Sequence, residues 1–142
     1  MSVQTEKGIL DAVREHGRTR YPEECCGFLL GRLDHDGRKV IVAAERAENV
    51  RPENRERRYT IAPEDYLAAD RDAQRKGLDI VGFYHSHPDH PARPSATDLV
   101  EATFPEYVYV ITSVNKGEPG DLTAWTLAAD RSEFVEEAID IV

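Results

Sequence analysis

Hydrophobic and polar positions along the chain predict three helices, near its start, in its middle and at the beginning of its last third. Residues 5–18 carry apolar side chains at helical spacing, which predicts a first helix. A second helix is expected from Pro63 to Gly77, because proline suits a first helical turn and glycine suits the position after a helix. A short third helix is expected over residues 95–103.

Short apolar runs separated by turn residues predict the strands. The expected strands are residues 25–31, 39–44, 59–61, 79–87, 107–114 and 122–128. Within the run at 79–87, residues 80–84 are apolar throughout, which is typical of a central strand covered on both faces. Residues 134–142 fit either a strand or a helix. The whole of 1–142 is therefore expected to form one α/β domain, with a mixed, mostly antiparallel, curved sheet flanked by helices.

Composition removes several classes of function. The chain of 142 residues has 27 acidic and 18 basic side chains, a formal charge of −9. This balance argues against a general nucleic-acid binder and against a protein that sits on anionic lipid. No apolar run approaches the ~18 residues needed to span a bilayer, and no signal peptide is expected at the start. The adjacent Cys25 and Cys26 are poorly placed to form a disulfide, so we expect a cytoplasmic protein.

The candidate chemistry lies at the end of the expected central strand. Alternate residues of a strand point to the same face, so His85 and His87 project together. Pro88 ends the strand, and the proline-rich turn after it can bring Asp98 back from the first turn of the next helix. Two histidines, one carboxylate and one water form the open tetrahedral arrangement of a catalytic zinc.

Each of these residues also has a simpler interpretation. Ser95 and Asp98 form the pattern of a capping box at the start of a helix. A pair of histidines at positions i and i+2 is more often polar surface or core than a metal site. The capping and ligand roles of Asp98 are compatible, and the joint occurrence of all the pieces favours a metal site.

A zinc site of this kind needs a general base, and Glu24 is a candidate. It precedes an apolar strand that could lie against the His85–His87 strand. Spacing alone does not distinguish Glu24 from Glu23, because both could be solvated charges before a strand.

These residues resemble the JAMM (MPN+) metalloprotease family. Its pattern is a glutamate ahead of Cys-Gly on an early strand, followed by His-x-His-Pro, six residues and Ser-x-x-Asp. The chain has Glu24-Cys-Cys-Gly27, His85-Ser-His-Pro88 and Ser95-Ala-Thr-Asp98. The match spans residues 24–98 and is similar to that of small stand-alone bacterial members.

The resemblance implies a cytidine-deaminase-like fold and a zinc-dependent peptidase or isopeptidase with one Zn²⁺ per chain. It implies that His85, His87 and Asp98 bind the metal and that Glu24, rather than Glu23, is the general base for a zinc-activated water. Ser95 is implied to stabilise the oxyanion. The implied partner is a ubiquitin-like or sulfur-carrier protein, hydrolysed after its Gly-Gly C-terminus. The oligomeric state stays open.

Three other functions compete with this hypothesis. The chain could be a catalytically silent MPN-type binding or scaffold module, although it keeps every ligand residue. A hydrolase with Cys25 or Cys26 as nucleophile is disfavoured, because cysteines buried in strands are usually inert. A base deaminase is excluded, because its His-x-Glu and Cys-x-x-Cys signature is missing from the sequence.

Overall fold

The computed structural model describes residues 2–142 of the chain. The elements follow in the order β1 (Ser2–Thr5), α1 (Lys7–Arg20), β2 (Cys26–Leu33), β3 (Lys39–Ala47), α2 (Pro63–Arg75), β4 (Asp79–Pro88), α3 (Ala96–Glu101), β5 (Val108–Asn115), β6 (Glu118–Leu127) and β7 (Phe134–Ile141). The residues at the start of α2 favour a helix there. Pro63 occupies the first turn of α2 together with two acidic residues, which suit the positive end of the helix dipole.

The strands form a closed barrel in the order β1-β3-β2-β4-β5-β6-β7. The expected curved sheet is therefore wrong, because the strands close into a barrel. The barrel closes because β1 pairs in parallel with both β3 and β7, and its alternate residues Val3 and Thr5 are buried. Sequence analysis missed β1, since four residues are too few to give a periodic signal beside the helix that follows. The expected relation to cytidine deaminases stays a prediction.

Two further expectations are resolved by the structure. Residues 59–61 are not a strand, because the backbone of Thr60 bonds to residues 49 and 50 of the preceding loop. The ambiguous C-terminal segment is a strand, β7, whose partners are β6 and β1. The expected strands at 25–31, 39–44, 79–87, 107–114 and 122–128 correspond to β2 to β6, with small shifts at their ends.

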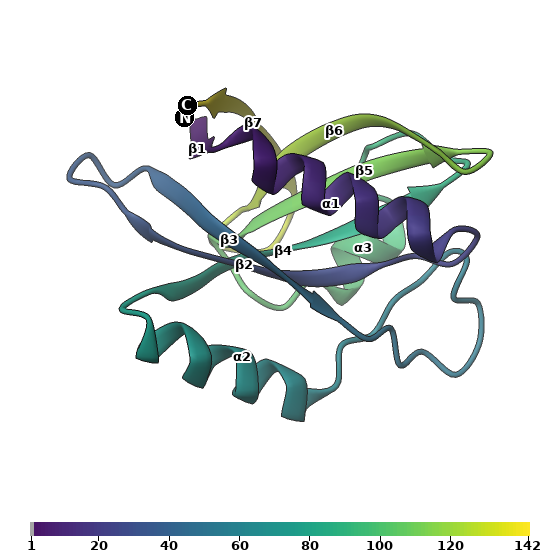
Figure 1. The fold of residues 1–142 in the computed structure, drawn as a ribbon, viewed down its shortest axis with the longest axis horizontal. Coiled ribbons are helices and arrows are strands. Elements are labelled where there is room, and N and C mark those ends of the chain that lie inside the picture. The colour runs from purple at the N-terminus through teal and green to yellow at the C-terminus, as the bar shows by residue number, and fades with distance from the viewer. Residues whose placement is uncertain (1) are drawn as a thin grey trace.

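The helices cover different sides of the central strands. α1 and α2 lie on opposite sides of the β2, β3 and β4 strands (Figure 1). Side chains of β4 alternate accordingly. Phe83 packs in the cluster that contains Ala69 and Ala73 of α2, and Tyr84 packs in the cluster that contains Val13 of α1. This alternation determines on which side of the sheet the His85 and His87 side chains of β4 lie.

Close strand packing explains one glycine of the Glu24-Cys-Cys-Gly27 motif. A Cβ atom on Gly27 would collide with the Tyr84 ring of the neighbouring β4 and with the backbone oxygen of Glu45 in β3. Any larger residue would therefore push apart the strands that frame the candidate site.

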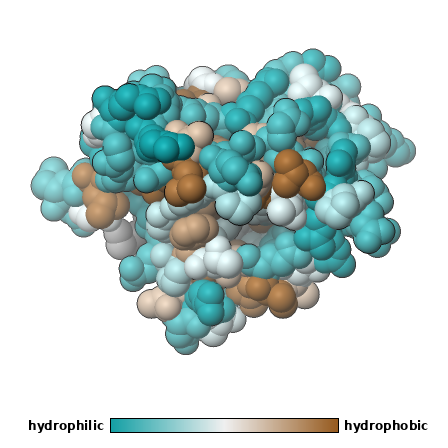
Figure 2. Space-filling view, turned by 90° about the horizontal axis from the view of Figure 1, so that it is seen from below, coloured by the Kyte–Doolittle hydropathy of each residue, from teal (hydrophilic) through white to brown (hydrophobic). Residues whose placement is uncertain are grey.

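Among the described residues, no helix is both long enough and apolar enough to cross a membrane. On the face of the molecule seen from below, hydrophobic residues reach the surface in several separate spots among hydrophilic ones (Figure 2).

Candidate metal centre and active site

Three side chains converge at the end of β4. The Nε2 atoms of His85 and His87 lie 3.2 Å apart, and Asp98 Oδ2 lies 3.3 Å from the first and 3.0 Å from the second. The strand supplies the histidines by its two-residue alternation, and α3 supplies Asp98 from its first turn. Three donor atoms aimed at one point are the arrangement of a metal site.

The environment favours the protonation states that a cation needs. Burial lowers the pKa of His85, which keeps its imidazole neutral. Burial alone would raise the pKa of Asp98, but His85, His87 and the backbone N–H of Ser95 hold it well below its usual range. A neutral His85 imidazole and an ionised Asp98 carboxylate fit a divalent metal ion, and two nitrogens with one oxygen suit zinc.

Contacts behind the ligands orient them. His87 donates from Nδ1 to the backbone oxygen of Pro91 at 2.8 Å, because a carbonyl can only accept. This bond leaves the Nε2 lone pair of His87 free to face the triad. The Tyr59 ring stacks on the His85 ring with centroids 4.7 Å apart. Tyr59, which was expected in a strand, therefore covers one face of the His85 imidazole.

Glu24 lies beside this group, in the same cleft as His87 and Ser95. Its side chain is buried, with 4% of its surface exposed, and its Oε1 atom has no hydrogen-bond partner among the described residues. Burial, aided by the charges of Asp98 and Glu101, raises the pKa of Glu24 to about 9, while Arg58 opposes the shift. An unpartnered buried carboxyl next to convergent ligands fits a site built to receive a cation and water. Glu23, in contrast, is half-buried and does not line the cleft.

Ser95 has the capping role that its spacing predicted. Its Oγ accepts from the backbone N–H of Asp98 at 3.0 Å, and its own N–H donates to Asp98 Oδ2 at 2.8 Å. The same carboxylate oxygen thus receives the capping bond and faces the histidines. The capping and ligand interpretations of Asp98 are geometrically compatible.

The cleft around these groups has a volume of about 360 Å³. It is lined by Glu24, Arg57, Arg58, His87, His90, Pro91, Arg93, Ser95 and Thr97. Its walls carry several cations although the chain as a whole is acidic. Arg58 belongs to the loop before α2, and its Nη1 donates to Thr97 Oγ1 of α3 at 2.6 Å. This bond joins two walls of the cleft.

Sequence analysis missed Asn49, which holds the loop against Glu24. Its Nδ2 donates to the backbone oxygens of Glu24 at 3.1 Å and Arg58 at 3.0 Å. Its Oδ1 accepts from the backbone N–H groups of Arg51 and Thr60, both at 3.1 Å. No spacing rule indicates such a role, because the four partners come together only when the loop folds.

The two cysteines lie next to the site but are unsuited to nucleophilic chemistry. Cys25 and Cys26 are buried, with 1% and 0% of their surfaces exposed. Burial raises the pKa of the Cys25 thiol to about 11, and it raises the pKa of Cys26 still further. Thiols that stay protonated and covered are poor nucleophiles.

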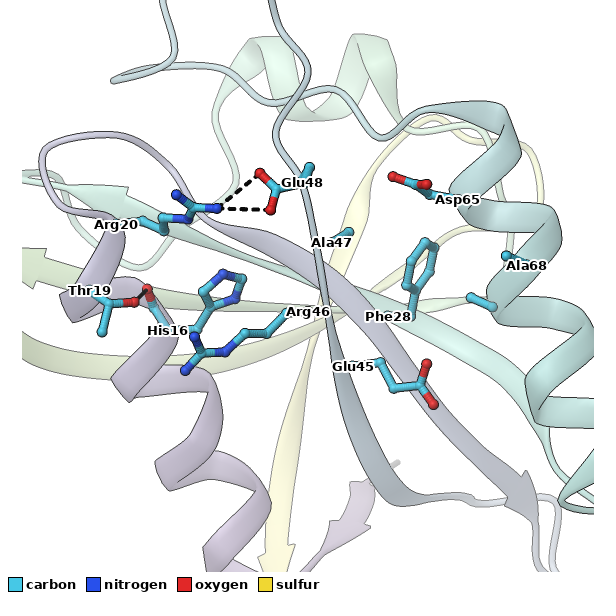
Figure 3. A pocket seen from close by; sticks show the side chains of 11 residues that line it. His16, Thr19, Arg20, Phe28, Glu45, Arg46, Ala47, Glu48, Asp65 and Ala68 are labelled. Carbon is cyan, nitrogen blue, oxygen red and sulfur yellow. Dashed lines mark hydrogen bonds and ion pairs between the residues drawn. The ribbon is translucent and has the colours of Figure 1, made fainter.

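A second, larger cavity of about 670 Å³ lies between α1 and α2, across β3 (Figure 3). Arg20 donates through Nη2 to both carboxylate oxygens of Glu48, at 3.0 and 2.9 Å, and the pair stands at one side of this cavity. His16, at the α1 wall, bonds the buried Tyr84 hydroxyl at 2.8 Å. None of the convergent ligands lines this cavity.

The His-His-Asp group is of a kind that could hold a metal ion, as in metal-dependent hydrolases. The model of prokaryotic homologues of the JAB domain matches residues 6–128, and the chain belongs to this family. It is a peptidase or isopeptidase of the JAMM type, like the relatives it matches.

Two relatives and one solved structure cover nearly the whole chain. A desampylase of Haloferax volcanii is 36% identical over 99% of this chain and 95% of its own. A CysO-cysteine peptidase of Mycobacterium tuberculosis is 27% identical over 94% of this chain and 87% of its own. A solution structure of a Salinibacter ruber protein is 58% identical, with a TM-score of 0.80, over 99% of this chain and 92% of its own.

Proposed function

We propose that residues 1–142 form one zinc-dependent peptidase or isopeptidase domain, which cleaves after the Gly-Gly C-terminus of a ubiquitin-like or sulfur-carrier protein. The observation that carries this proposal is the convergence of His85, His87 and Asp98 beside the buried, unpartnered Glu24 carboxyl. The printed names of the relatives, a desampylase and a CysO-cysteine peptidase, support a protein-linked substrate.

The ligands of the proposed zinc are the Nε2 atoms of His85 and His87 and a carboxylate oxygen of Asp98. Zinc bound there would polarise the scissile carbonyl, lower the pKa of a water and favour the ionised form of Glu24. Glu24 then accepts the proton of the attacking water and returns it to the departing amine. Its place in the cleft that His87 and Ser95 also line supports this role.

Ser95 is the proposed donor to the oxyanion. Its Oγ already accepts the Asp98 N–H, and no described acceptor takes its hydroxyl proton. That proton therefore remains free to donate to negative charge that develops on the scissile carbonyl oxygen.

The cleft also suits the proposed partner. A Gly-Gly tail lacks side chains and can approach a buried acid in a narrow site. Arg57 and Arg93 on the walls would face acidic groups of the carrier, and this contact would steer association at low salt.

Mass spectrometry of a small panel of conjugates tests the proposal. The zinc-loaded chain is incubated with a carrier joined through Gly-Gly to an amino acid or to a lysine side chain, and with the same conjugates carrying Ala-Ala instead. We expect cleavage only after Gly-Gly, its loss on chelation and its return when zinc is added. Equal cleavage of the Ala-Ala conjugates contradicts the proposed specificity.

Asp98→Asn provides a control for the metal. It should lose zinc and turnover together, because an amide oxygen is a weaker ligand than a carboxylate. Full turnover by this variant after extensive chelation contradicts a metal-dependent reaction.

A further inference from the structure

The loop that joins the ligand-bearing β4 to α3 is fastened at both ends. At its start, Asp89 has a positive φ of 57° and accepts the Tyr21 hydroxyl and the Lys116 N–H, both at 2.7 Å. At its end, the capping box of Ser95 and Asp98 fixes the first turn of α3. The carbonyl that orients His87 lies between these two anchors, at Pro91.

The middle of this loop has its own anchor on β6. Thr123 Oγ1 donates to the backbone oxygen of Ala92 at 2.6 Å, and Ala92 is buried although it belongs to a loop. Ala92 directly follows Pro91, so this bond fixes the peptide unit adjacent to the carbonyl that receives His87 Nδ1.

The Thr123 hydroxyl is itself oriented by Trp125. The indole Nε1 donates to Thr123 Oγ1 at 2.8 Å. An indole nitrogen can only donate, so the threonine oxygen must accept from it. The single hydroxyl proton of Thr123 is thereby left for Ala92, and the direction of the relay from Trp125 to Thr123 to Ala92 is determined.

The sheet register aligns this relay with the ligands. Thr123 pairs with Ile111 of β5, and Ile111 pairs with His85 of β4. The anchor and the first histidine therefore lie in one row across three adjacent strands, held by the barrel rather than by the loop alone.

We propose that Thr123, oriented by Trp125, is a positioning residue for the metal site. It holds the Pro91–Ala92 segment so that His87 keeps its proton on Nδ1 and presents the Nε2 lone pair to the metal. The inference rests on the proposed function for its metal, but it also concerns the tautomer of His87 in the metal-free chain. Outer contacts of this kind alter metal affinity by about 10- to 100-fold.

Substitution of the hydroxyl alone is the direct test. Thr123→Val keeps the shape of the side chain but leaves Ala92 without its donor, whereas Thr123→Ser keeps the hydroxyl. Thr126→Val, on the same strand, is the matched control, because no hydrogen bond of the Thr126 side chain is found within residues 2–142.

Zinc affinity, measured by competition with a chromogenic chelator, is the first readout. We expect Thr123→Val to weaken zinc binding about 10-fold or more, and Thr123→Ser and Thr126→Val to stay within about 3-fold of the parent chain. Trp125→Phe should lower zinc affinity less than Thr123→Val does. In the Trp125→Phe variant the Thr123 hydroxyl can rotate, but it can still donate to Ala92. Equal affinity of Thr123→Val and the parent, or equal weakening by Val and Ser, overturns the inference.

The tautomer of His87 is the second readout and does not require metal. Two-bond ¹H–¹⁵N spectra of the metal-free chain should show a single tautomer, protonated on Nδ1, in the parent and in Thr123→Ser, and a mixture in Thr123→Val. An unchanged tautomer in Thr123→Val overturns the positioning role. Failure of the parent chain to bind zinc counts against the proposed function instead, and the spectra still decide this inference.

Discussion

Two charged cavities formed by the described residues differ in how their polar groups are satisfied. In the cavity between α1 and α2, Arg20 pairs with Glu48, and His16 bonds Tyr84. In the smaller cleft at the end of β4, the buried Glu24 carboxyl has an oxygen without a partner, and three ligand atoms face one point. The difference teaches that unsatisfied polar groups, rather than cavity size, mark the candidate site.

The largest expected effect is at Glu24. Glu24→Gln should lower turnover by about 10²- to 10⁴-fold, because an amide cannot accept the proton of water. Zinc should remain bound, and the thermal midpoint of the metal-free chain should not fall, because the replaced carboxyl is buried without a partner at Oε1. Steady-state rates, metal content and a thermal melt measure these three quantities. Glu23→Gln is the matched control, and an equal loss of turnover in it contradicts the assignment.

In the α1–α2 cavity we expect an effect on stability that depends on pH. Burial, with the charges of Arg46 and Arg20, lowers the pKa of His16 from 6.5 to about 4. Between these values the unfolded chain binds a proton that the folded chain does not, so the free energy of unfolding falls as the pH is lowered. The loss from His16 is at most about 3 kcal/mol.

Denaturant unfolding of the metal-free chain at several pH values measures this loss. His16→Gln should show a shallower decline in the free energy of unfolding across the same window. The other titrating groups are common to both chains, so the difference isolates His16. Parallel pH profiles for the two chains argue against a neutral, buried His16.

At the edge of the cleft, Asn49 should affect both stability and turnover. Asn49→Ala leaves four backbone groups without their partner, and we expect a loss of about 2 kcal/mol in the free energy of unfolding. Asn49→Asp keeps the acceptor for Arg51 and Thr60 but loses both donors. Asn49→Asp should therefore lower turnover, because Glu24 loses the bond to its backbone oxygen. Its free energy of unfolding should fall less than that of Asn49→Ala. Denaturant unfolding and steady-state rates check both variants, and equal stability losses in the two contradict the division of roles.

The smallest effect is expected from the exposed pair in the larger cavity. Arg20→Ala should lower the free energy of unfolding by at most about 1 kcal/mol, because exposed ion pairs contribute little. Turnover should stay at the parent level. A double-mutant cycle with Glu48→Ala measures the coupling, and a clear loss of turnover in either single variant would extend the functional region into this cavity.

The parts of the fold that depend on local pattern were predictable. The apolar runs of β2 and β4, the alternation that aligns His85 with His87, and the capping box at Ser95 all follow from spacing within a few residues. Closure of the barrel was not predictable in this way. It depends on pairing between strands at the two ends of the sequence.

The same distinction holds for the candidate site. The pattern His-x-His-Pro with Ser-x-x-Asp marks three ligand candidates that the structure brings together, but spacing alone could not separate Glu24 from Glu23. In the structure Glu24 is buried and lines the cleft, whereas Glu23 is half-buried and does not. Asn49 and Thr123 gave no signal, because asparagine and threonine occur in many loops and strands, and most of their partners lie 9 to 31 residues away.

Pairing of β1 with β7 has a consequence for synthesis on the ribosome. Residues 2–5 leave the ribosome long before the strand they join, residues 134–141. β1 can therefore complete its pairing only after β7 has been synthesised. A nascent chain stalled before Phe134 leaves this edge of β1 open to pairing with other polypeptides.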